Sequence, residues 1–220
     1  MLIDDMAKMV HENAVDHGWW DGERNWPEII SLIHSEWSEA LEEARKGNPL
    51  AYVDADVRGP EQIESVMMKV ERDAEGRYVY EGKEFGGRKP EGVAIELMDG
   101  VIRILDLFGS LNYSVQRVDG TGPQELEELY QRDRFMQDVP QEVSELVAVL
   151  HVDTSMALCG ELRYGEEIKA EITEMGLLML EEAMSLAMSW VKDHGMDPMG
   201  LLMEKHEYNK GRPYKHGKKF

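Results

Sequence analysis

The sequence predicts an all-α protein. Apolar residues recur every three or four positions in several long stretches, the spacing that places them on one face of a helix. Proline and glycine punctuate the clearest stretch, because Pro27 suits a first helical turn and Gly47 suits a helix stop. Helices are predicted, in order along the chain, over residues 27 to 46, 91 to 109, 124 to 137, 140 to 158, 166 to 193 and 198 to 209.

Residues 48 to 90 are predicted to form an insertion that contains a small β-hairpin. The stretches VMMKV and RYVYEGKEF flank the turn-like sequence DAEG at residues 73 to 76. With 42% hydrophobic residues among 220, the chain can bury a substantial core. We therefore expect a single domain over residues 1 to 220, ending in a basic tail over residues 205 to 220.

The composition excludes several classes of protein. The 44 acidic and 24 basic side chains give a net charge of -20, so the surface should repel duplex nucleic acid. No stretch offers the roughly 20 uninterrupted apolar residues of a membrane span, and the acidic start MLIDDMAKMV lacks the apolar core of a secretory signal. The single Cys159 allows no internal disulfide. We expect a cytoplasmic protein that binds neither duplex nucleic acid nor membranes.

A narrow polar stripe runs along the predicted helix over residues 91 to 109, whose surface is otherwise apolar. Its members, at i, i+3, i+7 and i+10, are Glu96, Asp99, Arg103 and Asp106. An ionised carboxylate buried without a partner costs several kcal/mol, so the stripe requires bound cations or a solvent-filled cleft. A half-exposed helix whose acids pair with Arg103 is the alternative.

The predicted helix over residues 27 to 46 carries its own row of acids. Glu36, Glu39 and Glu43 lie at i, i+3 and i+7 beside the apolar stripe, and like charges at that spacing repel. Mg²⁺ or Mn²⁺, which prefer oxygen ligands, would relieve the repulsion. Such rows are also common on solvated helices. Antiparallel packing of the two helices would bring both sets of carboxylates across one cleft.

The two acidic rows resemble the paired ExxE and ExxD motifs of the MazG-like, all-α nucleoside triphosphate pyrophosphohydrolases. Here the motifs are Glu36-x-x-Glu39 and Glu96-x-x-Asp99. The segment IHSEWSEALEEARKG is similar to the first metal helix of that family, and PEGVAIELMDGVIRILDLFG is similar to the second. The ending EKHEYNKGRPYKHGKKF resembles a C-terminal signature of a bacterial and phage branch.

The resemblance implies a four-helix-bundle-like core, here with additional helices. In the family the two motifs usually lie closer together, so the hairpin-containing insertion separates them in this chain. The resemblance also implies a homodimer or higher homo-oligomer. Residues 110 to 195 contain more helix than a minimal member needs, so they could supply within one chain the helices that the family borrows from a partner subunit.

The resemblance further implies Mg²⁺-dependent hydrolysis of a nucleoside or deoxynucleoside triphosphate to the monophosphate and pyrophosphate. Two or more Mg²⁺ ions, for which Mn²⁺ could substitute, would be held by Glu36, Glu39, Glu96 and Asp99. The ions would bridge the triphosphate while water attacks at the α–β phosphoanhydride. Glu39 and Glu43 are the expected catalytic residues, with Glu43 orienting or deprotonating the water, and Asp106 is a further candidate.

Donor-rich residues near the C-terminus are candidates for binding the phosphate oxygens. They are Lys205, Asn209, Arg212, Tyr214, His216 and Lys218. A basic tail without fixed structure is the alternative. Near the N-terminus, the sequence HGWWDGERNW makes Trp20 a candidate for stacking on the base, with ordinary core packing as the alternative.

Two other enzyme classes fit the sequence poorly. A ferritin-like di-iron bundle needs a glutamate three residues before a histidine on two helices, and no histidine here has one. A P-loop NTPase needs a serine or threonine after its lysine, and GRPYKHGKK lacks it. The remaining rival is a catalytically silent helical regulatory or interaction protein that retains an acidic metal cleft.

Overall fold

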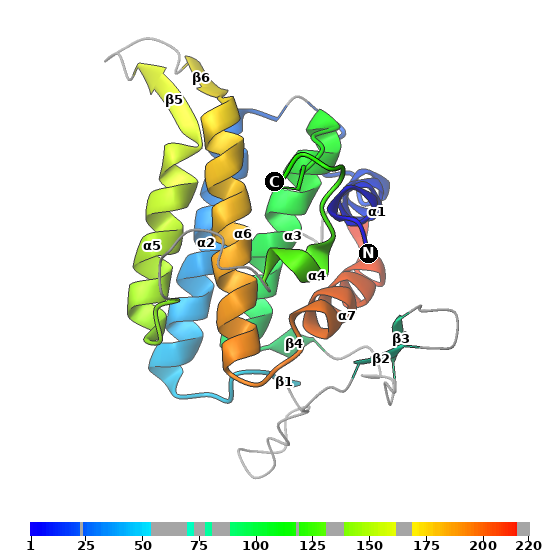
Figure 1. Ribbon diagram of the computed structural model, residues 1–220. Coiled ribbons are helices and arrows are strands. Elements are labelled where there is room, and N and C mark those ends of the chain that lie inside the picture. The colour runs from blue at the N-terminus through cyan, green and yellow to red at the C-terminus, as the bar shows by residue number, and fades with distance from the viewer. Residues whose placement is uncertain are drawn as a thin grey trace.

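A computed structural model describes residues 1–22, 24–53, 70–72, 78–80, 89–117, 119–130, 139–161 and 169–214. The predicted all-α fold is confirmed, since helices make up most of the regular structure within these ranges (Figure 1). They are α1 (Ile3–Asp16), α2 (Trp26–Lys46), α3 (Val93–Leu111), α4 (Leu126–Leu129), α5 (Val143–Met156), α6 (Glu174–Asp193) and α7 (Pro198–Lys210). Each of these helices is too short or too polar to cross a lipid bilayer.

Four long helices, α2, α3, α5 and α6, lie side by side in Figure 1. Both α2 and α6 pack against α3 and α5, so the four helices close into a bundle. The helices α1 and α7 also pack on α3. Because neighbours cover α3 on several sides, apolar side chains such as Leu97, Val101 and Ile104 are fully buried along its length.

Local signals at both ends set the limits of α2. The Asn25 side chain accepts a hydrogen bond from the backbone N–H of Glu28 at 2.8 Å, and Pro27 occupies the first turn. The helix ends at Gly47, whose φ of 72° is a left-handed conformation that glycine adopts without strain. The observed helix therefore begins one residue before the predicted one and ends where predicted.

Short strands connect the helices at the ends of the bundle. β1 (Tyr52–Val53), which follows α2, pairs antiparallel with β4 (Pro90–Glu91), which precedes α3. The end of α2 and the start of α3 therefore lie together, and the two helices run antiparallel (Figure 1). β2 (Val70–Arg72) pairs antiparallel with β3 (Tyr78–Tyr80) in the predicted hairpin. The other residues between 54 and 88 lie outside the described ranges.

The contact between α2 and α3 depends on a glycine. A Cβ atom at Gly100 would lie 2.1 Å from Cζ3 of Trp37, which is far closer than packed atoms approach. The Trp37 ring occupies the space that the missing side chain leaves, and its Nε1 donates a hydrogen bond to Oγ1 of Thr154 on α5 at 2.9 Å. Glu36 immediately precedes Trp37, and Asp99 immediately precedes Gly100. The contact between Trp37 and Gly100 therefore sets the separation of the two acidic rows.

The helix α1 was not predicted from the sequence. Its buried residues follow the helical period and are Ile3, Met6, Ala7 and Val10. Asp4 and Asp5 lie in the first turn, where negative charge stabilises the positive end of a helix dipole. The apolar face of α1 is narrow, and its burial depends on α3, so the signal within this segment alone is weak.

Other predicted helix boundaries were wrong. β5 (Leu158–Glu161) pairs antiparallel with β6 (Lys169–Ile172), so strands replace the predicted end of α5 and the predicted start of α6. The Thr173 hydroxyl marks the start of α6, because it accepts a hydrogen bond from the backbone N–H of Gly176 at 3.0 Å. The predicted helix over residues 124 to 137 begins later, as α4, and residues 131 to 138 lie outside the described ranges. The last helix, α7, matches its prediction within one residue.

Substituting Gly100→Ala should destabilise the protein by roughly 1–3 kcal/mol, because the added methyl group must displace the Trp37 ring. Urea-induced unfolding measures this change. Gly22→Ala is the control, since a Cβ atom at Gly22 meets nothing within 4 Å. Alanine has the higher intrinsic helix propensity, so an unchanged or increased stability of the Gly100 variant would show that the close contact is absent.

Candidate functional site

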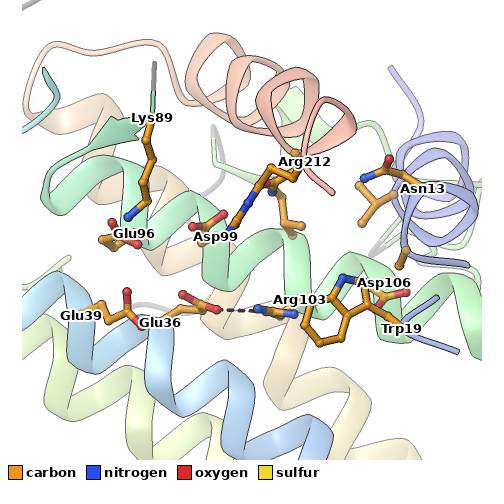
Figure 2. A pocket seen from close by; sticks show the side chains of 14 residues that line it. Asn13, Trp19, Glu36, Glu39, Lys89, Glu96, Asp99, Arg103, Asp106 and Arg212 are labelled. Carbon is orange, nitrogen blue, oxygen red and sulfur yellow. Dashed lines mark hydrogen bonds and ion pairs between the residues drawn. The ribbon is translucent and has the colours of Figure 1, made fainter. Parts of the chain in front are cut away.

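A cleft of about 280 Å³ lies between α1, α2, α3 and α7 (Figure 2). Its apolar wall consists of Val10, Ala14, Trp19 and Ile102. Its polar lining consists of Asn13, Glu36, Glu39, Lys89, Glu96, Asp99, Arg103, Asp106, Asn209 and Arg212. Carboxylates from two helices and cationic side chains from several elements therefore face one cleft.

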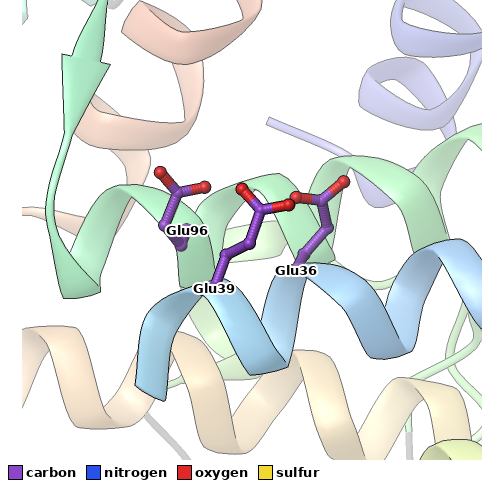
Figure 3. Close-up of side chains that lie close together, drawn as sticks. All are labelled: Glu36, Glu39 and Glu96. Carbon is purple, nitrogen blue, oxygen red and sulfur yellow. The ribbon is translucent and has the colours of Figure 1, made fainter. Parts of the chain in front are cut away.

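Three glutamates converge at one end of the cleft. Glu36 and Glu39 come from α2 and Glu96 comes from α3, and one carboxylate oxygen of each lies within 4.8 Å of the other two (Figure 3). Glu36 and Glu96 are buried, whereas Glu39 is exposed. Oxygens bound to one Mg²⁺ ion lie within about 4 Å of one another, so small side-chain rotations would bring all three onto one ion.

Burial controls the protonation of this cluster. It raises the pKa of Glu96 from its ordinary 4.5 to about 8, against the opposing attraction of Lys205 and Lys89. Burial also raises the pKa of Glu36, although the guanidinium of Arg103 acts in the opposite direction. Without a bound cation, Glu96 therefore holds a proton at neutral pH. A divalent ion would supply the positive charge that the ionised cluster needs.

Two basic side chains already pair with carboxylates of the cleft. Nε of Arg103 lies 2.9 Å from Oε1 of Glu36, the ion pair drawn in Figure 2. Nζ of Lys205 lies 2.8 Å from Oδ2 of Asp99, and the Lys205 side chain is only 1% exposed. Of the four predicted metal ligands, Asp99 lines the cleft but lies outside the group of three converging oxygens. Lys205, predicted to bind substrate, is instead a buried partner of Asp99.

Glu43, the predicted water-activating residue, does not line the cleft. Its carboxylate accepts hydrogen bonds from Nζ of Lys46 at 2.6 Å, Nδ2 of Asn48 at 3.0 Å and the hydroxyl of Tyr52 at 2.8 Å. Burial would raise the pKa of Glu43, but these hydrogen bonds outweigh it and lower the pKa. The contacts of Glu43 tie the end of α2 to the chain that leads into β1.

Of the other predicted substrate-binding residues near the C-terminus, some line the cleft and others do not. Asn209 and Arg212 line the cleft, and Oδ1 of Asn209 is buried and has no hydrogen-bond partner among the residues that the structure describes. The hydroxyl of Tyr214 donates to Oδ2 of Asp21 at 2.5 Å, away from the cleft lining. His216 and Lys218 lie outside the described residues.

Trp19, rather than Trp20, forms part of the cleft wall. The guanidinium carbon of Arg103 lies 5.7 Å from the centroid of the Trp19 ring. Trp20 instead donates from Nε1 to Oδ1 of Asp106 at 3.0 Å, and Nδ1 of His11 lies 2.8 Å from the same oxygen. The sequence indicated an aromatic contribution from this segment but could not show which of two consecutive tryptophans faces the cleft.

Asn13 and Lys89 were missed by the sequence-based prediction. Asn13 belongs to α1, and its position one turn beyond Val10 would have indicated the same helix face if α1 had been recognised. Lys89 precedes β4, and its Nζ lies 3.1 Å from Oε1 of Glu91. The pairing of β1 with β4 brings this lysine to the cleft. No motif in the sequence marks it, since that pairing is a tertiary contact.

No family model, curated protein or solved structure matches this chain. The resemblance to the MazG-like enzymes therefore remains a prediction from the two acidic motifs and the C-terminal segment.

The metal-free protein should lose stability as the pH rises from about 4.5 to about 8, because folded Glu96 keeps a proton that the unfolded chain releases. The stabilisation from the Glu96 proton is complete below the ordinary pKa of a glutamate and is lost as the pH rises through the raised pKa of folded Glu96. Glu96→Gln removes the titration at nearly constant volume. The free energy of unfolding of the variant should therefore fall less over the same range.

Urea titrations in the presence of a chelator, repeated across this pH range, measure the difference. Burial also raises the pKa of Glu204 to about 8, but Glu204 titrates in both proteins and cancels in the comparison. Equal pH dependence in the parent and the Glu96→Gln variant would contradict a protonated, buried Glu96.

Proposed function

We propose that this protein is a Mg²⁺-dependent nucleoside triphosphate pyrophosphohydrolase similar to the MazG-like all-α enzymes. It would hydrolyse a nucleoside or deoxynucleoside triphosphate to the monophosphate and pyrophosphate. The supporting observation is the convergence of Glu36, Glu39 and Glu96 on one cleft from two antiparallel helices. Asn209 and Arg212 line the same cleft and offer donors that suit phosphate oxygens.

The donor set fits Mg²⁺. Carboxylate oxygens are hard ligands, and a divalent ion would stabilise the ionised forms of Glu36 and Glu96, whose pKa values are raised by burial. When bound, Mg²⁺ would neutralise the charge that develops as the α–β phosphoanhydride breaks. Because the carboxylates would otherwise repel a triphosphate, the same ion should be needed for nucleotide binding as well as for hydrolysis.

The remaining roles fall to side chains of the cleft. Glu39 is the exposed member of the cluster, and we assign it to orient or deprotonate the attacking water. Arg212 would hold phosphate oxygens through its guanidinium. The ion pairs with Arg103 and Lys205 would hold Glu36 and Asp99 in place until a metal ion competes for these carboxylates. Glu43 has no part in this scheme, because three donors already hold its carboxylate.

One observation favours the catalytically silent regulatory or interaction protein. Arg103 and Lys205 already pair with Glu36 and Asp99, so two of the four acids have partners that are part of the chain. A cleft of this kind could persist as a polar core without turnover. Measurement of hydrolysis distinguishes the two functions directly.

The purified protein should release pyrophosphate from at least one nucleotide of a panel of ribo- and deoxyribonucleoside triphosphates when Mg²⁺ is present. Glu39→Gln should lower kcat roughly a hundredfold or more, because a positioned carboxylate contributes at least that much to proton transfer. Separation of the products by ion-exchange chromatography measures both reactions.

Glu42→Gln is the matched control for this experiment. Glu42 lies on the same helix, is exposed and pairs with a nearby surface arginine, Arg45, at 2.6 Å. The control should retain the parent activity. Absence of pyrophosphate with every nucleotide, in both Mg²⁺ and Mn²⁺, would favour the silent protein.

Lys205→Met should strengthen the binding of Mn²⁺, used as a probe for Mg²⁺, by roughly tenfold, which is about 1.4 kcal/mol. The reason is that Lys205 competes with a metal ion for the Asp99 carboxylate. Isothermal titration calorimetry without nucleotide measures the affinity. Lys210→Met is the control on the same helix, because Lys210 pairs with the exposed Glu207. Weaker or unchanged Mn²⁺ binding in a folded Lys205 variant would contradict the competition.

A further inference from the structure

A pair of histidines lies at the contact between α2 and α5. His34 belongs to α2 and His151 to α5, and their Nδ1 atoms are 2.7 Å apart. The two rings are nearly parallel, with an angle of 18° between their planes and 5.0 Å between their centroids. Both side chains are half-buried, so solvent can reach them. Neither histidine lines the acidic cleft.

Two serines repeat the same arrangement on both helices. Each histidine is followed four residues later by a serine, Ser38 on α2 and Ser155 on α5. Oγ of Ser38 lies 3.5 Å from Nε2 of His151, and Oγ of Ser155 lies 3.4 Å from Nε2 of His34. The contacts are therefore reciprocal across the helix pair, with each serine facing the histidine of the other helix.

The serine hydroxyls face Nε2 of each histidine as acceptors. Ser38 donates its hydrogen to the backbone carbonyl of His34 at 2.9 Å, and Ser155 donates to that of His151 at 2.7 Å. Since a hydroxyl has one hydrogen, each serine oxygen can accept from an Nε2–H but cannot also donate to Nε2. The two Nδ1 atoms face each other at 2.7 Å, a distance at which one Nδ1–H can donate to the lone pair of the other. A metal cation could take the place of that shared proton and bind both nitrogens.

We propose that Nδ1 of His34 and Nδ1 of His151 form a two-nitrogen site for a transition-metal cation of the Zn²⁺ or Cu²⁺ class. Imidazole nitrogen suits these ions, whereas Mg²⁺ prefers oxygen. Two nitrogens on one tetrahedral Zn²⁺, each about 2.0–2.1 Å from the metal, lie roughly 3.4 Å apart, so the two Nδ1 atoms would have to separate by less than about 1 Å. The rings would also have to rotate, because the two Nδ1 atoms now point at each other and not at a common ion. Water would complete the coordination from the exposed side.

The electrostatic surroundings support this site. Burial lowers the pKa of both histidines, and the presence of His151 lowers that of His34 further. Both imidazoles are therefore neutral at physiological pH, which is the form that binds metal. The Trp37–Thr154 hydrogen bond joins the same two helices nearby. A metal ion on the histidine pair would act as a second link between α2 and α5.

Cu²⁺ and Zn²⁺ are the probes for this site, used on the full chain after treatment with a chelator and in the presence of excess Mg²⁺ to occupy the acidic cleft. The electron paramagnetic resonance spectrum of bound Cu²⁺ should show two nitrogen ligands. His34→Gln and His151→Gln should each reduce this signature to one nitrogen. Each variant should weaken Zn²⁺ binding roughly a hundredfold, because the ion would lose one of two ligands that the fold holds side by side.

His194→Gln is the matched control. His194 is also half-buried, but its Nδ1 is 2.8 Å from the backbone carbonyl of Trp190 and its ring stacks on that tryptophan. This variant should keep the parent Zn²⁺ affinity and the parent spectrum. Zn²⁺ should also raise the thermal midpoint of the parent and the control but not that of the two pair variants.

Two results would overturn the proposal. One is a Zn²⁺ affinity that is the same in the parent and both pair variants. The other is a Cu²⁺ spectrum of the parent without two nitrogen ligands, a measurement that does not depend on whether the variants fold. Neither result affects the proposed pyrophosphohydrolase, because the two sites share no ligand.

Discussion

Buried negative charge is the constraint on which the arrangement of this protein depends. Glu36 and Glu96 are withdrawn from solvent at the contact between α2 and α3, and Glu39 lies beside them. Ionised carboxylates in such surroundings need positive charge nearby, which Arg103 and Lys205 provide in part and a proton on Glu96 completes. Lys205 belongs to α7, so the position of that helix against α3 is tied to the acids that α3 carries. The polar residues of this core therefore contribute to the placement of α2 and α7 against α3.

Apolar packing determines how closely those acids approach one another. The Trp37 ring fills the space beside Gly100 and reaches α5 through Thr154, so one side chain positions α2 against two neighbours. A larger residue at position 100 would separate the two helices and move the carboxylates apart. A cation can be shared only by oxygens a few ångströms apart. The proposed metal site therefore depends on an apolar contact as well as on its carboxylates.

Helical spacing was sufficient to predict α2, α3 and α7, because each has strong periodicity or clear end signals in its own residues. Spacing also predicted that Glu36 and Glu39 would face Glu96, since it needed only antiparallel packing of two recognised helices. It could not predict that Lys205 holds Asp99, a contact between residues more than a hundred positions apart. Helical spacing also did not predict that Asn48 and Tyr52, which follow α2, would hydrogen-bond to Glu43. Local periodicity identifies a face of a helix, but the partners of that face depend on tertiary structure.

The helix α2 carries two kinds of ligand on different sides. Residues two positions apart on a helix point about 200° apart, so His34 and Glu36 face nearly opposite directions, toward α5 and α3. The first side offers imidazole nitrogen and the second offers carboxylate oxygen, and cations of different classes prefer each. Trp37 contacts both neighbouring helices, so it links the two sides of α2. In the two proposals the sites share no ligand, and one cation would join α2 to α5 while the other would serve the nucleotide.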